Sequence, residues 1–174
     1  SCTAIGNTEK NATPAVTELI LRLSQRFPRH FFFTTSYLTT QQVTDKQLPP
    51  NAGVIVSAIN FPLRRIDGKD AKEKAFAGQL EQWKNVTKNI YIWDYINNFD
   101  DYLTPMPILK IARQRLQFFK QHGASGIFFN GSGYSYSSFD EMRTFVLSAL
   151  LINPELSVDN LTASFFNQEY PAAK

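Results

Sequence analysis

Short apolar runs alternate along this chain with longer stretches in which apolar residues recur every three or four positions. The short runs are rich in β-branched and aromatic residues, which favour strands buried on both faces. The longer stretches have the spacing of amphipathic helices. The pattern predicts strands at about residues 30–37, 53–59, 89–95 and 126–130, and helices at about residues 13–27, 69–84, 107–122, 138–152 and 157–170.

Several helix ends carry local signals. Thr13 followed by Pro14 predicts a helix start, with the threonine as N-cap and the proline in the first turn. Gly123 stands where a C-cap glycine belongs. Ser138 and Glu141 have the spacing of a capping box and predict the start of the fourth helix.

Alternating strands and helices predict an α/β fold with a parallel sheet and right-handed crossovers. A closed (β/α)8 barrel needs eight strands and about 250 residues, whereas this chain has 174 residues and four predicted strands. We therefore expect a single α/β domain over residues 1–174, either a small open domain or about half of a TIM-type (β/α)8 barrel.

Composition excludes several classes of function. The net charge is only +3, and the basic residues form no run that would build a phosphate-binding stripe, so we expect no nucleic-acid partner. No apolar segment is long enough to span a membrane. The single cysteine, Cys2, and the two histidines, His30 and His122, are too few for a cysteine- or histidine-based metal site. The sequence therefore predicts neither a metal nor a cofactor.

Asp94 is the first candidate for chemistry. It follows the apolar run of the third predicted strand, at the carboxyl end where parallel sheets hold their ligands. A carboxylate is costly to bury without a partner, so a catalytic role as a general acid or base is one interpretation. The alternative is that Asp94 caps a loop or pairs with an arginine, as structural carboxylates often do.

The other residues at the strand ends and in the following loops are mostly amides and aromatics. Sugars present many hydroxyls and apolar ring faces, which suit such side chains. We therefore predict a sugar-binding set, and it consists of Tyr37, Asn60, Trp93, Tyr95, Asn98, Asn130, Tyr134 and Tyr136.

Glycoside hydrolysis usually needs two carboxyl groups roughly 5 to 10 Å apart. Only Asp94 lies at a predicted strand end. Asp100 and Asp101 lie further along the same loop, and Glu141 is explained as a helix cap. The second member of a catalytic pair is therefore not visible in the sequence.

Several motifs resemble a bacterial glycoside-hydrolase-like family of unknown function that is related to the α-glucuronidase barrels. The resemblance covers nearly the whole chain, and its most specific motifs are YIWDY at residues 91–95, NF at 98–99, the two prolines of YLTPMP at 102–107, FFKQHGASGIF at 118–128 and NPE at 153–155. One position departs from the pattern, because Phe129 stands where relatives often carry a glutamate.

This resemblance implies a (β/α)8 barrel in secreted, periplasmic or cell-surface proteins that handle polysaccharide. It also implies that the chain is the C-terminal half of the barrel, with an N-terminal half missing. Our first hypothesis is accordingly a glycoside hydrolase acting on a glycan, with Asp94 as the candidate catalytic residue. The second is a non-catalytic carbohydrate-binding or scaffold barrel that lacks the second carboxylate. A third is a free-standing small α/β domain with no role in sugar binding.

Overall fold

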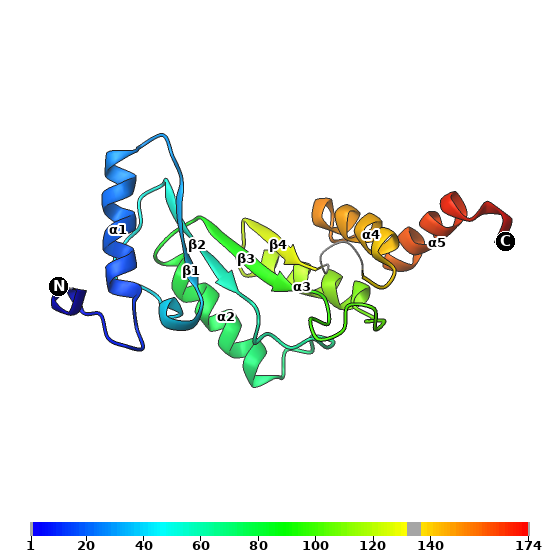
Figure 1. The fold of residues 1–174 in the computed structure, drawn as a ribbon, viewed down its shortest axis with the longest axis horizontal. Coiled ribbons are helices and arrows are strands. Elements are labelled where there is room, and N and C mark those ends of the chain that lie inside the picture. Colours follow the sequence, from blue (N-terminus) through cyan, green and yellow to red (C-terminus); the bar gives the residue numbers. More distant parts are fainter. Residues whose placement is uncertain (1, 132–136, 174) are drawn as a thin grey trace.

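The computed structural model describes residues 2–131 and 137–173, which form a sheet with helices at its side and end (Figure 1). The strands are β1 (Phe32–Ser36), β2 (Ala52–Ser57), β3 (Ile90–Tyr95) and β4 (Gly126–Asn130). The helices are α1 (Thr13–Arg26), α2 (Ala71–Lys84), α3 (Leu109–Gln121), α4 (Asp140–Ile152) and α5 (Val158–Glu169), with short 3-10 turns η1 (Cys2–Ile5), η2 (Leu38–Thr40) and η3 (Pro171–Ala173).

The sheet has the order β1-β2-β3-β4, and every neighbouring pair is parallel. The four strands alternate with helices, which confirms the predicted α/β class and is consistent with half of a (β/α)8 barrel. Observed boundaries differ from the predicted ones by one or two residues, which is the usual uncertainty at element ends.

One face of the sheet carries the main hydrophobic core. Val54 and Val56 of β2 and Ile90 and Ile92 of β3 are fully or almost fully buried there. They pack against side chains of α2 and α3, which are Phe76, Leu80, Trp83 and Phe119. Because side chains alternate along a strand, this packing fixes which residues of β2 and β3 face the helices and which face away.

A second core joins the last three helices. Ala112 and Leu116 of α3 pack with Val146 and Leu150 of α4 and with Val158 of α5. In Figure 1 these helices continue from the β4 side of the sheet toward the C-terminus, at the opposite end of the molecule from α1. The C-terminal helices are therefore held mainly by one another and by α3.

Two of the three helix-end predictions need correction. Pro14 lies in the first turn of α1 as predicted, but the N-cap is Ala12, and the Asn11 side chain accepts from the Thr13 N–H. The predicted capping box is wrong, because α4 begins at Asp140 after a left-handed Phe139 with φ of 54°. Gly123 has φ of +88°, which confirms the predicted C-cap glycine.

We expect the helix-facing core to dominate stability. Replacing Leu80 by alanine leaves a cavity beneath the sheet and should lower the free energy of unfolding by about 2–5 kcal/mol. The matched control is Leu19→Ala on the exposed side of α1, expected to change it by less than about 0.5 kcal/mol. Urea denaturation measures both, and equal effects would contradict this assignment of the core.

Candidate functional site

The other face of the sheet carries no comparable layer of helices among the described residues. In β3, Ile90, Ile92 and Asp94 are buried toward the helices, whereas Tyr91, Trp93 and Tyr95 alternate with them and stay half-buried or exposed. We call this second side the open face; register places on it Phe33, Thr35, Ile55, Ser57, Tyr91, Trp93, Tyr95, Phe128 and Asn130.

Aromatic rings run along the open face toward the carboxyl ends of the strands. The ring centroids of Tyr37 and Trp93 lie 6.0 Å apart, and those of Trp93 and Tyr95 are stacked at 5.6 Å with an interplanar angle of 20°. Ser57, the register partner of Trp93 on β2, is small. Three of the predicted sugar-binding residues thus form one continuous aromatic surface.

The surface extends into the loop after β3. Tyr95 meets Phe99 edge-on at 5.9 Å, and Phe99 meets Tyr102 at the same distance. Phe99 was absent from the sequence-based set, although its place in the tyrosine- and asparagine-rich loop could have signalled it. The full ring series is therefore Tyr37, Trp93, Tyr95, Phe99 and Tyr102, which we call the aromatic row.

Polar groups accompany the row. The Trp93 indole N–H is buried and has no hydrogen-bond partner among the described residues, and such orphaned donors are uncommon in folded proteins. Asn130 is the register partner of Tyr95 and is half-buried beside it. The strand ends therefore combine flat apolar surface with an amide and an unused donor.

Two other predicted residues lie apart from the row. Asn60 is exposed and lines a separate cavity of about 340 Å³ with Gln41, Lys72 and Gln79. Asn98 is half-buried, and its side-chain oxygen accepts from the Asp100 N–H, which is the arrangement of a local turn. The remaining predicted residues, Tyr134 and Tyr136, lie outside the described residues.

Asp94 faces the helices rather than the row and has no solvent exposure. The Arg115 Nε donates to Asp94 Oδ2 at 2.8 Å, and Arg115 Nη2 donates to Asp94 Oδ1. Asp94 Oδ1 also accepts from the Tyr95 N–H at 2.8 Å. The alternative interpretation of Asp94, a carboxylate paired with an arginine, is what these contacts show.

Arg115 is itself fully bonded. Its Nη1 donates to the Phe61 and Pro62 carbonyls at 3.2 and 2.7 Å, and its guanidinium carbon lies 4.6 Å from the centre of the Phe61 ring. Sequence reasoning missed Arg115. The available signal was an arginine three positions after Ala112, on the helix face that carries the apolar residues.

The other acidic residues near this end of the sheet do not join Asp94. Asp100 and Asp101 are exposed in the loop after β3, and a hydrogen bond from the Thr104 hydroxyl lowers the pKa of Asp101. Phe129, the register partner of Asp94, is half-buried against α3 and α4 residues. The catalytic role of Asp94 stays a prediction, and its observed contacts do not favour that role.

Neither a metal-binding cluster nor a membrane-spanning helix is present among the described residues. Residues 2–131 and 137–173 contain no group of three or more histidine, cysteine or acidic side chains placed to hold a metal ion. In the same ranges, every helix is too short or too polar to cross a membrane.

Breaking the ion pair from one side should be costly. Arg115→Met leaves the Asp94 carboxylate buried without its partner and should lower the free energy of unfolding by about 3–5 kcal/mol. Adding Asp94→Asn should recover part of this loss, with a coupling energy above about 1 kcal/mol in urea denaturation. Arg22→Met on the surface of α1 is the control and should cost at most about 1 kcal/mol. Additive effects of the two core substitutions would refute the pair.

Comparison with known proteins gives one match. The family model described as "Domain of unknown function (DUF4838)" matches residues 5–174. Neither the curated proteins nor the solved structures contain a match to the chain. Because the family match covers all four strands and all five α-helices, the chain belongs to the DUF4838 family of domains of unknown function.

Proposed function

We propose that this chain binds carbohydrate on its open face, as part of a carbohydrate-active (β/α)8-type barrel. The observation that carries the proposal is the aromatic row at the carboxyl ends of the strands. The resemblance of the sequence motifs to glycoside-hydrolase-like and α-glucuronidase barrels supports it. Parallel sheets hold ligands at this same end.

The chemistry of the row suits a sugar. Tyr37, Trp93 and Tyr95 offer adjacent ring faces, and stacked or edge-on aromatics bury large apolar areas. The Asn130 amide can both donate to and accept from hydroxyls, and the Trp93 N–H, which has no partner among the described residues, can only donate. The described strand residues that register places on the open face are all uncharged, which suits a neutral pyranose ring better than a phosphate.

Binding without cleavage by Asp94 is the version that the geometry favours. Hydrolysis needs carboxyl groups that face the sugar, whereas Asp94 lies on the helix side and both of its oxygens accept from Arg115. A glycoside hydrolase remains the competing hypothesis. In that case carboxyl groups other than Asp94 would act as the acid and the base.

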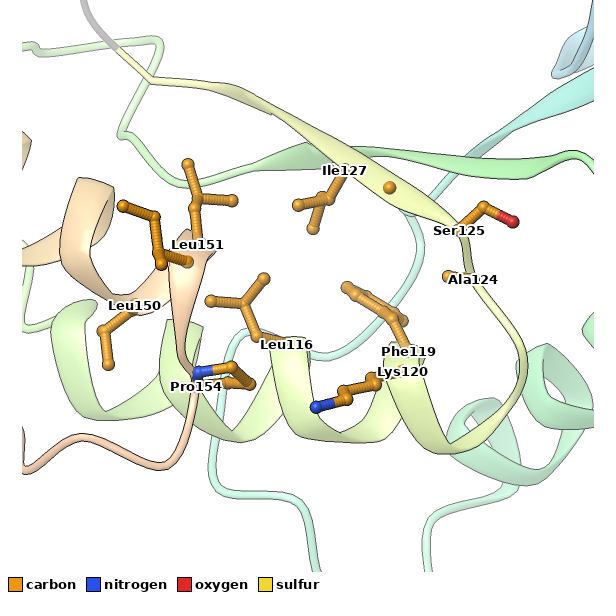
Figure 2. Close-up of a pocket in the computed structure, with 11 residues that line it drawn as sticks. Leu116, Phe119, Lys120, Ala124, Ser125, Ile127, Leu150, Leu151 and Pro154 are labelled. Atoms are coloured by element: carbon orange, nitrogen blue, oxygen red, sulfur yellow. The ribbon is translucent and has the colours of Figure 1, made fainter.

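We also propose that further polypeptide pairs with the edges of the sheet and closes the barrel, with the aromatic row at the carboxyl-end mouth. β1 and β4 are edge strands, and exposed edges with unpaired backbone groups are normally covered in folded proteins. Figure 2 shows Ile127 of β4 pointing toward Leu116 and Phe119 of α3 across a cavity of about 250 Å³. Phe128 on the other side of β4 is 59% exposed. Unpaired edges and uncovered apolar side chains support a missing half of the barrel.

A location outside the cytoplasm, whether secreted, periplasmic or at the cell surface, belongs to the same proposal. It rests on the family resemblance of the sequence motifs alone. Labelling of the intact protein with a membrane-impermeant reagent in whole cells would test it.

Glycan binding by the row is tested by substitution. Trp93→Ala should weaken binding to soluble polysaccharides, measured by affinity electrophoresis, by about tenfold or more, because a central aromatic anchor is lost. The control is Tyr170→Ala, which removes an exposed ring directly after α5. This substitution should leave glycan binding unchanged. Unaltered binding by Trp93→Ala would remove the row from the ligand site.

The competing hydrolase hypothesis is tested with Asp94→Asn. We expect this variant to lose stability but to keep any glycan binding, since the carboxylate faces away from the row. Release of reducing ends by the parent protein that disappears in folded Asp94→Asn would instead establish a catalytic Asp94.

Barrel completion is tested at β4. In the 174-residue chain alone, Phe128→Lys should reduce self-association in sedimentation velocity with little loss of stability, because the ring is exposed. In the longer polypeptide the same change should destabilise by about 2–4 kcal/mol, because it would place a charge in the barrel interior. Phe31→Lys, also at an exposed ring, is the control. An equal change in the free energy of unfolding by Phe128→Lys in the 174-residue chain and in the longer polypeptide would refute a covering half of the barrel.

A further inference from the structure

A second buried arginine lies near the end of the sheet. Arg143 of α4 is 5% exposed, and its guanidinium reaches back to the chain that follows β3. Its Nη2 donates to the Ile96 carbonyl at 2.5 Å, and its Nη1 donates to Asn97 Oδ1 at 2.9 Å and to Ser137 Oγ at 3.4 Å. The cation is thus fixed at the carboxyl ends of β3 and β4.

Arg143 and Arg115 differ in their charged partners. Arg115 pairs with the Asp94 carboxylate, whereas no carboxylate of the described residues lies within ion-pair distance of Arg143. Burial lowers the pKa of Arg143, and the nearby Asp140 carboxylate only partly offsets this effect. A buried cation without a counter-charge is energetically unusual.

Two donors in this cluster are also unused. Arg143 Nε and Asn97 Nδ2 are buried and have no hydrogen-bond partner among the described residues. Both belong to side chains that are bonded to each other through Nη1 and Oδ1. Buried polar groups are normally satisfied, and exceptions call for a physical reason.

The cluster borders an open cavity. Arg143 lines a space of about 210 Å³, large enough for a small organic group, together with Ile96, Phe129, Gly131, Asp140 and Thr144. The space lies between the end of β4 and one side of α4, from Asp140 in the first turn of the helix to Leu151 in its last turn. A ligand group entering it would meet the positive end of the α4 dipole as well as the guanidinium.

We propose that this cavity binds the carboxylate of an acidic ligand through Arg143, which lines it and is held in place by Asn97. A carboxylate brings one negative charge and acceptor oxygens, which match a guanidinium with no ion-pair partner and with an unused Nε–H among the described residues. Asp140 also lines the cavity, where its Oδ1 accepts from Ser137 Oγ at 2.9 Å. The negative charge of Asp140 repels a bound carboxylate, so removal of this charge should tighten carboxylate binding.

The inference does not depend on the ligand being a sugar. Acetate carries the proposed group with no ring to stack on the aromatic row, so it probes Arg143 alone. Acetate binding together with failure of every polysaccharide would uphold this site and overturn the proposed function. Polysaccharide binding without acetate binding would uphold the proposed function and overturn this site.

The direct test is an NMR titration of the 174-residue chain with sodium acetate, with sodium chloride keeping the ionic strength constant. The Nε–Hε signal of Arg143, assigned by its loss in Arg143→Lys, should shift in a saturable way. The Arg115 signal is the internal control and should stay in place, because its Nε already donates to Asp94. An Arg143 signal that does not move, or that moves no differently with chloride alone, would overturn the proposal.

Variants at the cavity sharpen the test. Asp140→Asn keeps an acceptor for Ser137 but removes a like charge, and should tighten acetate binding about threefold or more. Thr144→Glu places a carboxylate in the same cavity and should abolish the acetate-dependent shift. Both substitutions leave the Arg143 contacts to Ile96 and Asn97 in place. Acetate affinity that is equal in both variants and the parent would contradict the site.

Discussion

The buried ion pair between Asp94 and Arg115 is the contact on which the rest of this structure depends. It joins three segments that are distant in sequence: the end of β3, the middle of α3 and the loop after β2, whose carbonyls at Phe61 and Pro62 complete the arginine's hydrogen bonds. Buried pairs offset their desolvation only when geometry and further bonds are good. Here the bidentate contact and the two carbonyls meet that condition.

The same pair decides which way the end of β3 faces. With Asp94 held on the helix side, alternation along the strand turns Trp93 and Tyr95 to the open face. The aromatic row is then a direct consequence of where the charge is buried. The contacts of the Asp94 carboxylate are those of a group that orients Trp93 and Tyr95. The proposed sugar contacts belong to these two aromatic residues.

The two buried arginines show how similar residues can differ in role. Arg115 has a carboxylate and two carbonyls, and each of its three guanidinium nitrogens donates at least one hydrogen bond. Arg143 is held almost as deeply, yet its Nε has no hydrogen-bond partner among the described residues and a cavity lies at its side. The first arrangement is complete within the chain, and the second is completed by a partner group from outside.

Much of the fold could be predicted from the sequence, because apolar runs and helical periodicity report burial directly. The parallel direction of the strands and the glycine C-cap at Gly123 followed from such rules. The capping box failed because Phe139 adopts a left-handed conformation that starts α4 later. The partner of Asp94 could not be predicted, because the pair spans 21 positions along the chain and only tertiary packing selects Arg115 among the arginines.

The positions of the proposed sugar-binding residues could be predicted only in part, and their binding of sugar stays a prediction. Strand-end residues Trp93, Tyr95 and Asn130 share an edge by topology alone, so the sheet brings them together. Asn60 and Asn98 lie in loops whose paths no periodicity reports, and they lie in a separate cavity and a local turn. Prediction therefore succeeded where the sheet sets position and failed where loops do.

The two tryptophans allow the central claim to be measured directly. Trp83 is completely buried beneath the sheet, whereas Trp93 is only half-buried on the open face, so acrylamide should quench mainly Trp93 in the free protein. If the row holds the glycan, a saturating polysaccharide should protect Trp93 and reduce quenching to the low level of Trp83. A polysaccharide that binds the protein while quenching stays at its free-protein value would contradict the account.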